Sequence, residues 1–173
     1  MKLKQFTWTA LLSASLSLAS PAAPQPSSCS TNTTPNDFNS TCASIASKLE
    51  VENGVVYFSE FVAAGTNLSL PDNNATCAQS FQLVTADICR ISLYVSTTDH
   101  SGFNMEAWLP SNWTGRYLST GNGGLNGCIK YQDLAYTSGV GFAAAGTNNG
   151  HNGTSGQPFY KNADIVEDFA YRA

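Results

Sequence analysis

The segment with the clearest potential for chemistry is a glycine-rich run at residues 121–127, Gly-Asn-Gly-Gly-Leu-Asn-Gly, which directly follows a predicted strand. A dinucleotide-binding fingerprint requires glycine at its sixth position, where this run has Asn126. A phosphate-binding loop ends in Gly-Lys-Ser/Thr, whereas Gly127 is followed by Cys128 and Ile129. The run could instead form an oxyanion hole, in which backbone N–H groups stabilise negative charge developing on an ester carbonyl oxygen. A tight turn that needs positive φ is the structural alternative.

Other residue types that can catalyse reactions form no complete constellation in the sequence. The Gly-x-Ser-x-Gly pattern of a nucleophile elbow does not occur, and Gly153-Thr154-Ser155-Gly156 departs from it. His100 falls in a predicted turn, where we expect it to be exposed. His151 follows a predicted buried strand, and we expect it to stabilise its loop or line a pocket rather than act as a catalytic base. The carboxylates show no pairing typical of a glycosidase.

Five cysteines, Cys29, Cys42, Cys77, Cys89 and Cys128, are candidates for disulfides in an oxidising compartment. Their spacing fits no zinc module, so we expect no metal site built on them. An odd number leaves one cysteine free, bonded to another molecule, or paired with a cysteine that this sequence does not contain.

The N-terminal residues and the glycosylation sequons together predict a secreted protein. Residues 1–19 combine a short basic start with an apolar stretch rich in Leu and Ala, which is typical of a signal peptide. That stretch is too short to span a membrane, and no later stretch approaches eighteen apolar residues. Six Asn-x-Ser/Thr sequons support the same compartment. They lie at Asn32, Asn39, Asn67, Asn74, Asn112 and Asn152.

The composition excludes several other classes of protein. With 42% hydrophobic and 11% aromatic residues, the chain has the means to bury a core, so overall disorder is excluded. Charged residues make up only 12%, the net charge is −4, and no basic run occurs. Binding to nucleic acid through neutralised phosphates is therefore disfavoured.

The pattern of apolar residues predicts the elements that would position the glycine-rich run. Residues 20–41 are expected to be a flexible lead-in, with order beginning near Asn39. Strict alternation predicts an antiparallel hairpin from 91–95 and 103–109, whose strands are each buried on one face. The other expected elements are a helix at 39–49, a strand at 55–62, a loop at 65–75, a strand at 116–120, a helix at 129–136, a strand at 141–145 and a helix beginning at 163.

Three stretches resemble the tannase and feruloyl esterase family, most closely its fungal feruloyl esterase B type. They are Trp113-Thr114-Gly115-Arg116-Tyr117-Leu118 leading into Gly121–Gly124, the run from Gly141 to His151, and Asp168-Phe169-Ala170-Tyr171-Arg172-Ala173. The resemblance implies an α/β protein in which residues 42–173 are the N-terminal portion of an α/β-hydrolase catalytic domain, truncated before the nucleophile elbow. The order of predicted strands and helices agrees with the beginning of that fold.

The resemblance also implies an activity and several site residues. Family members are secreted serine esterases that form an acyl-enzyme, so the expected substrates are phenolic-acid esters of plant cell-wall polysaccharide, such as ferulates. The Ser-Asp-His triad and a calcium site in the lid would lie beyond residue 173, and the fragment itself would be inactive. Gly123 and Gly124 would form the oxyanion loop. The implied disulfides are Cys42–Cys89 and Cys77–Cys128, leaving Cys29 unpaired.

Two alternatives remain open from the sequence. The first is a tannase acting on galloyl esters, which would carry the same motifs. The acyl pocket that would distinguish the two kinds of substrate lies mostly outside this sequence. A secreted glycoprotein without enzymatic activity could instead bind cell-wall carbohydrate through exposed aromatic side chains such as Trp108, Trp113 and Tyr117.

Overall fold

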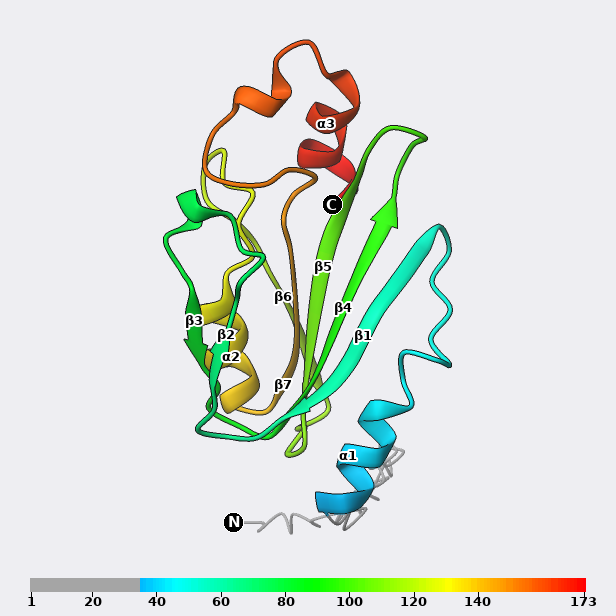
Figure 1. The fold of residues 1–173 in the computed structure, drawn as a ribbon, viewed down its shortest axis with the longest axis vertical. Coiled ribbons are helices and arrows are strands. Elements are labelled where there is room, and N and C mark those ends of the chain that lie inside the picture. The colour runs from blue at the N-terminus through cyan, green and yellow to red at the C-terminus, as the bar shows by residue number, and fades with distance from the viewer. Residues whose placement is uncertain (1–34) are drawn as a thin grey trace, which may run out of the picture. The chain divides into compact units, whose positions relative to one another are not determined.

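The computed structural model describes residues 35–173, which Figure 1 shows as a ribbon. In chain order the elements are α1 (Pro35–Ala43), β1 (Gly54–Val62), β2 (Asn67–Ser69), β3 (Phe81–Leu83), β4 (Ile88–Ser96), β5 (Gly102–Pro110), β6 (Arg116–Thr120), α2 (Tyr131–Gly139), β7 (Phe142–Thr147) and α3 (Ala163–Glu167). A π-helical turn, Asp168–Arg172, continues α3. The predicted signal peptide, Cys29 and Asn32 lie outside the described residues.

Five of the strands form one mixed sheet in the order β1-β4-β5-β7-β6. The pairs β1–β4, β4–β5 and β5–β7 are antiparallel, whereas β6 and β7 are parallel and are joined through α2. A parallel pair needs such a crossover because no tight turn can bring the chain back to the start of the neighbouring strand. The prediction of an α/β protein is confirmed at this level.

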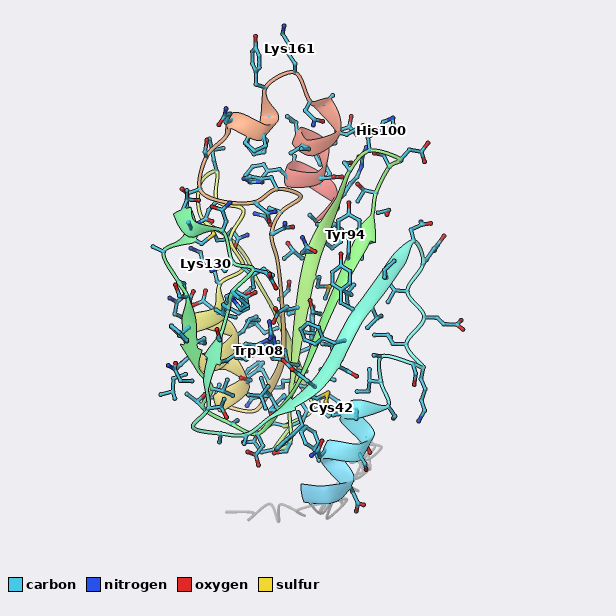
Figure 2. The ribbon with its side chains drawn as sticks, in the orientation of Figure 1. Cys42, Tyr94, His100, Trp108, Lys130 and Lys161 are labelled. Atoms are coloured by element: carbon cyan, nitrogen blue, oxygen red, sulfur yellow. A yellow bond between two sulfur atoms is a disulfide. The ribbon has the colours of Figure 1, made fainter. Side chains whose placement is uncertain are left out.

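The predicted hairpin is present as β4 and β5, with Leu93 opposite Met105 and Ile91 opposite Ala107. Figure 2 shows His100 at the tip of this hairpin, where it is exposed as expected. The alternation of apolar residues therefore located both strands and the turn between them.

The expectation that each hairpin strand is buried on one face only is wrong. One face packs with α1 in a cluster around Cys42, Cys89, Ile91 and Leu93. The other face packs beneath α2 and the residues between β1 and β4, and there Trp108 is fully buried. On this face Glu106 and Trp108 are buried, whereas Ser92, Tyr94 and Asn104 are only partly buried, so the second face is covered over part of its length.

The helix expected at 39–49 begins and ends earlier than predicted. It starts at Pro35, a position in the first helical turn that needs no backbone N–H donor. After Ala43 the chain turns, because the Ser44 and Ser47 hydroxyls donate to carbonyl oxygens three residues earlier and compete with the helical pattern. The last part of the predicted lead-in, residues 35–41, is therefore helical.

The expected loop at 65–75 contains a short strand. β2 pairs antiparallel with β3 in a separate two-stranded sheet. Three-residue strands are too short to show a period in the sequence, which explains the wrong prediction. Buried Leu70 and Val84 attach this small sheet to the core beneath α2.

Candidate functional site

The glycine-rich run at 121–127 lies where the parallel strands β6 and β7 end. It connects β6 to α2, and the segment 147–153 follows β7 at the same edge of the sheet. In open α/β sheets ligands bind at the carboxyl ends of the strands, where such loops meet. The fold therefore brings these two segments together at the position where a site is expected.

Side chains from the segment after β7 and from the run itself hold the glycine-rich run in place. The Asn122 side chain donates to the Thr147 carbonyl oxygen at 3.0 Å. The Asn149 side chain donates to the Asn126 carbonyl oxygen at 3.3 Å. The Asn126 side chain accepts from the Cys128 N–H at 2.7 Å, which closes the end of the run.

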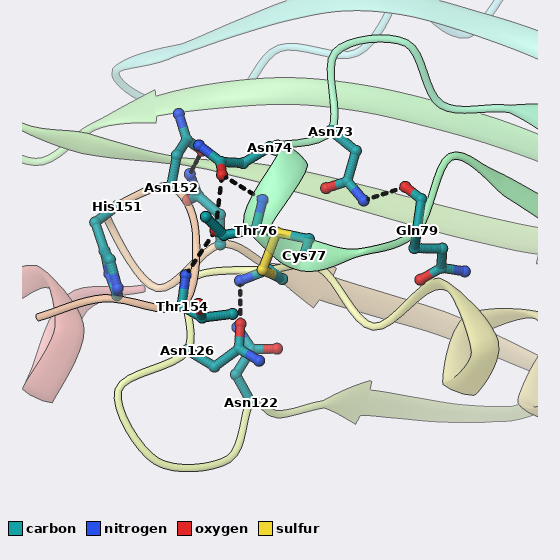
Figure 3. Close-up of a disulfide and its surroundings, with 12 residues drawn as sticks. Asn73, Asn74, Thr76, Cys77, Gln79, Asn122, Asn126, His151, Asn152 and Thr154 are labelled. Atoms are coloured by element: carbon teal, nitrogen blue, oxygen red, sulfur yellow. Dashed lines mark hydrogen bonds between the residues drawn. A yellow bond between two sulfur atoms is a disulfide. The ribbon is translucent and has the colours of Figure 1, made fainter.

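Backbone and covalent contacts fix the last residues of the run more firmly. The Gly127 N–H donates to the Gly153 carbonyl oxygen at 2.8 Å. A disulfide joins Cys128 to Cys77, as Figure 3 shows, and a second joins Cys42 to Cys89. These are the two pairs that the family resemblance implies.

Gly123 and Gly124, in contrast, face open space. A Cβ atom added at either position would have no neighbour within 4 Å. Gly124 has φ +59°, a left-handed conformation that favours glycine, so the turn explanation for the run also holds there. Within the described part of the chain, neither N–H donates a hydrogen bond. Two backbone donors are thus free beside an anchored segment.

His151 contacts the glycine-rich run through the Leu125 carbonyl oxygen, and Figure 3 shows it beside Asn152 in the segment that follows β7. Its ring is buried, with Nε2 at 3.1 Å from the Leu125 carbonyl oxygen and Nδ1 at 3.3 Å from that of Asn149. Phe159 and Phe169 pack edgewise on the ring, with centroid distances of 4.8 and 5.7 Å. The expected role in stabilising the loop is confirmed by these contacts.

A second polar centre, which the sequence analysis did not identify, is the carboxylate of Glu106. Its oxygens accept from Arg90 Nε at 2.7 Å and Arg90 Nη2 at 2.5 Å. They also accept from Trp108 Nε1 and from the Tyr131 hydroxyl, both at 3.0 Å. Arg90 in turn reaches Glu60 on β1 at 3.0 Å. The cluster connects three strands of the sheet to the first residue of α2.

The electrostatics of this centre follow from its burial. The pKa of Tyr131 is raised, first by burial and then by the negative charge of Glu106. Burial alone would lower the pKa of Arg90, but the hydrogen bonds and charge of Glu106 outweigh burial and raise it. Arg90 therefore stays charged and Tyr131 stays a hydrogen-bond donor at neutral pH.

A cavity of about 730 Å³ lies between this polar centre and the segment 68–74, and Gly127 is the one residue of the glycine-rich run that lines it. Polar groups that line it include Glu60, Arg90, Ser92, Asn104, Asn148 and Asn152, and Gly127 marks its border with the run. The polar centre around Glu106 had a signal in the sequence. Glu106 and Trp108 are spaced to lie on one face of β5, and they pair with Ser92 and Arg90 on β4.

Of the three aromatic residues considered for carbohydrate binding, one is not at the surface. Trp108 is part of the core, whereas Trp113 and Tyr117 are 59% and 62% exposed. The Trp113 indole N–H donates to the Arg116 carbonyl oxygen, which holds it locally against the chain. A platform that includes Trp108 is therefore excluded.

The five sequons within residues 35–173 all have an exposed asparagine: Asn39, Asn67, Asn74, Asn112 and Asn152. In the same part of the chain, no helix is long and apolar enough to cross a membrane. No cluster of three or more His, Cys, Asp or Glu residues suited to a metal ion occurs among these residues.

Comparison with known proteins identifies a similar family and similar fungal proteins. Residues 89–173 match the family model described as "Tannase and feruloyl esterase". The chain is 57% identical over 136 residues to a protein of Neosartorya fischeri named "Probable feruloyl esterase B-2", covering 79% of this chain and 26% of that protein. A protein of the same name from Aspergillus flavus is 48% identical over 171 residues, covering 99% of this chain and 30% of the relative.

Solved structures show the same similarity. An esterase from Aspergillus oryzae superposes with a TM-score of 0.76 at 55% identity, covering 78% of this chain and 27% of that one. Feruloyl esterase B from the same organism gives a TM-score of 0.75 at 52% identity, with the same coverage. The resemblance inferred from three short stretches of sequence is confirmed. The chain spans less than a third of the length of each of these relatives.

Proposed function

We propose, on the premise that residues 89–173 form a segment of the tannase and feruloyl esterase family, that this chain is the N-terminal portion of a secreted serine carboxylic ester hydrolase. Its substrates are phenolic-acid esters of plant cell-wall polysaccharide, from which it releases ferulic or related hydroxycinnamic acids through an acyl-enzyme. The names of the similar fungal proteins support the ester class.

The observation that carries this proposal is the pair of unused backbone donors at Gly123 and Gly124. They lie in the loop after a strand of the parallel pair, which is where α/β-hydrolases place one oxyanion donor. A negative oxygen that forms on the ester carbonyl during attack would accept from such N–H groups. Because side chains and a disulfide fix the segment on either side, the donors would need little reorganisation when the charge forms.

The sheet supports the finer assignment to an α/β-hydrolase fold. After the three antiparallel strands β1, β4 and β5, β6 and β7 run parallel, and β7 lies between β5 and β6. β6 has a sheet partner on one side only among the described strands, and Tyr117 and Leu118 on it are exposed. We place the strand that would carry the nucleophile beside this free edge. The chain then supplies the oxyanion corner and lacks the triad, so residues 1–173 alone would be inactive.

Calcium enters no step of this proposal. The described residues offer no group of side chains for a metal ion, and the calcium site expected in the lid would be formed by residues outside this sequence.

The test is ester hydrolysis by the complete gene product that contains this chain, with methyl ferulate and methyl gallate as substrates. We expect turnover of methyl ferulate to exceed that of methyl gallate. Preference for the gallate would identify a tannase, and an absence of turnover with both esters would refute the proposal.

Variants at Gly123 test the role of the loop itself. Gly123→Pro removes the N–H group, and we expect kcat to fall by about 10²–10³, the usual effect of losing an oxyanion donor. Gly123→Ala is the matched control because it keeps the N–H and its Cβ would enter open space. Equal losses in the two variants would show that backbone shape, and not the donor, is what matters at this position.

A further inference from the structure

His151 has an environment that its burial alone does not explain. Both ring nitrogens face backbone carbonyl oxygens, Leu125 on one side and Asn149 on the other. A carbonyl oxygen only accepts hydrogen bonds, so a contact is a hydrogen bond only when its ring nitrogen carries the proton. A catalytic base needs an unprotonated nitrogen aimed at substrate, and here both nitrogens face backbone carbonyl oxygens instead.

The two contacts differ in what they can stabilise. The Asn149 contact is local, two residues away and 3.3 Å long, and it closes a turn. The Leu125 contact is shorter, at 3.1 Å, and joins residues 26 positions apart. In the neutral ring a single proton is available, and the longer-range, shorter contact favours placing it on Nε2. The histidine then ties the segment after β7 to the middle of the glycine-rich run.

The ring cannot easily move away from this contact. Phe159 and Phe169 pack on it edgewise and lie 5.0 Å apart from each other by their ring centroids. On the backbone side, a Cβ added to Gly127 would lie 2.2 Å from the His151 carbonyl oxygen, so the two chain segments are in direct contact. The Nε2 atom is therefore held at one place relative to the run.

We propose that His151 is a positioning residue for the oxyanion loop. Its Nε2–H holds the Leu125 carbonyl oxygen and so fixes the peptide plane between Leu125 and Asn126, two peptide units after the one that carries the Gly124 N–H. The two glycines are exposed and have no side chains, and within the described residues their N–H groups donate no hydrogen bond. Without the His151 bond, little would therefore restrict their backbone conformation. This inference deepens the proposed function and rests on it for its catalytic consequence.

The test compares three variants of the complete gene product at His151. Gln carries an amide N–H near the position of Nε2, Asn carries one near that of Nδ1, and Phe keeps the aromatic packing without any donor. We expect His151→Phe and His151→Asn to lower kcat about ten- to a hundredfold, as loss of precise positioning does, while KM changes less than about threefold. His151→Gln restores most of kcat. His100→Gln, at the exposed hairpin tip, is the control and leaves kcat unchanged.

A second readout does not depend on catalysis. The Gly127 and Cys128 N–H groups are hydrogen-bonded, so their amide hydrogen exchange should accelerate in the Phe and Asn variants and stay near the wild-type rate in the Gln variant. If the wild-type protein hydrolyses no ester, the proposed function fails, but the exchange rates still test the role of His151.

Two outcomes would overturn the inference. One is a Phe variant with wild-type kcat and wild-type exchange rates in the run. The other is an equal loss in the Gln, Asn and Phe variants, which would show that the ring acts through packing alone. Should the Phe variant fail to fold, the contrast between Gln and Asn decides the question, because the two carry the same amide and differ by one methylene group, which sets the contact that each can replace.

Discussion

Replacement of Glu106 by Gln should destabilise the protein far more than the same change at Glu60. Both carboxylates bind Arg90, but the Glu106 side chain is 4% exposed and that of Glu60 is 47% exposed. Gln at position 106 would place an N–H₂ group among donors from Arg90, Trp108 and Tyr131, and the buried guanidinium would lose its main counter-charge.

The magnitudes follow from burial. Breaking a buried ion pair by changing one partner costs about 3–5 kcal/mol, whereas an exposed pair contributes about 0–1 kcal/mol. We therefore expect Glu106→Gln to lower the free energy of unfolding by about 3–5 kcal/mol and Glu60→Gln by less than about 1 kcal/mol. The difference corresponds to at least a tenfold change in the folding equilibrium constant.

Urea denaturation of the gene product, followed by tryptophan fluorescence, measures both losses from the shift in midpoint at constant m-value. A double variant, Glu106→Leu with Arg90→Met, should lose less than the sum of the single changes, because no charge is then left buried and unpaired. If Glu60→Gln and Glu106→Gln cost the same, the reasoning from burial is wrong.

Three further outcomes are expected. In Tyr131→Phe, the loss of stability at alkaline pH should be smaller than in wild type. The raised pKa of Tyr131 adds stability that is complete below the unfolded-state pKa of about 10 and disappears as the pH rises through the folded-state pKa. Urea midpoints measured over a series of pH values test this difference. Cys128→Ser should cost about 4 kcal/mol by the loop-entropy model, since the bridge to Cys77 spans 51 residues, and thermal unfolding of the non-reduced proteins measures this loss. Asn112→Gln should remove one glycan from the secreted protein, seen as a mass difference that enzymatic deglycosylation abolishes; an unchanged mass would mean that this exposed sequon is not used.

The sequence predicted the elements whose period was clear. Alternation located β4 and β5, and the strand predicted at 116–120, directly before the glycines, is β6. The position of the glycine-rich run between β6 and α2 followed directly from those assignments.

Features that depend on tertiary contacts were not predictable from the pattern. Alternation placed Glu106 on the face opposite Met105 and Ala107, but it could not show that α2 would cover that face as well. The ends of α1 depend on side chains of Ser44 and Ser47 that compete with the helix, and β2 and β3 form only because their neighbours Leu70 and Val84 are buried.

For the candidate site, the sequence identified the residues but not their relations. Gly123, Gly124 and His151 were each singled out, yet nothing in their spacing indicated that the histidine would contact the Leu125 carbonyl oxygen. The cysteine pairs came from the family resemblance, since spacing alone left several pairings open.

The two disulfides have a consequence for how the chain can be oxidised. Their loops interleave, because Cys77 lies inside the segment closed by Cys42 and Cys89, and Cys89 lies inside the segment closed by Cys77 and Cys128. On the proposed secretory route the chain enters an oxidising compartment from its N-terminus, and Cys42 and Cys77 then emerge before either native partner. Pairing in order of emergence would therefore give a non-native bridge, and native pairing requires either delayed oxidation or thiol–disulfide exchange.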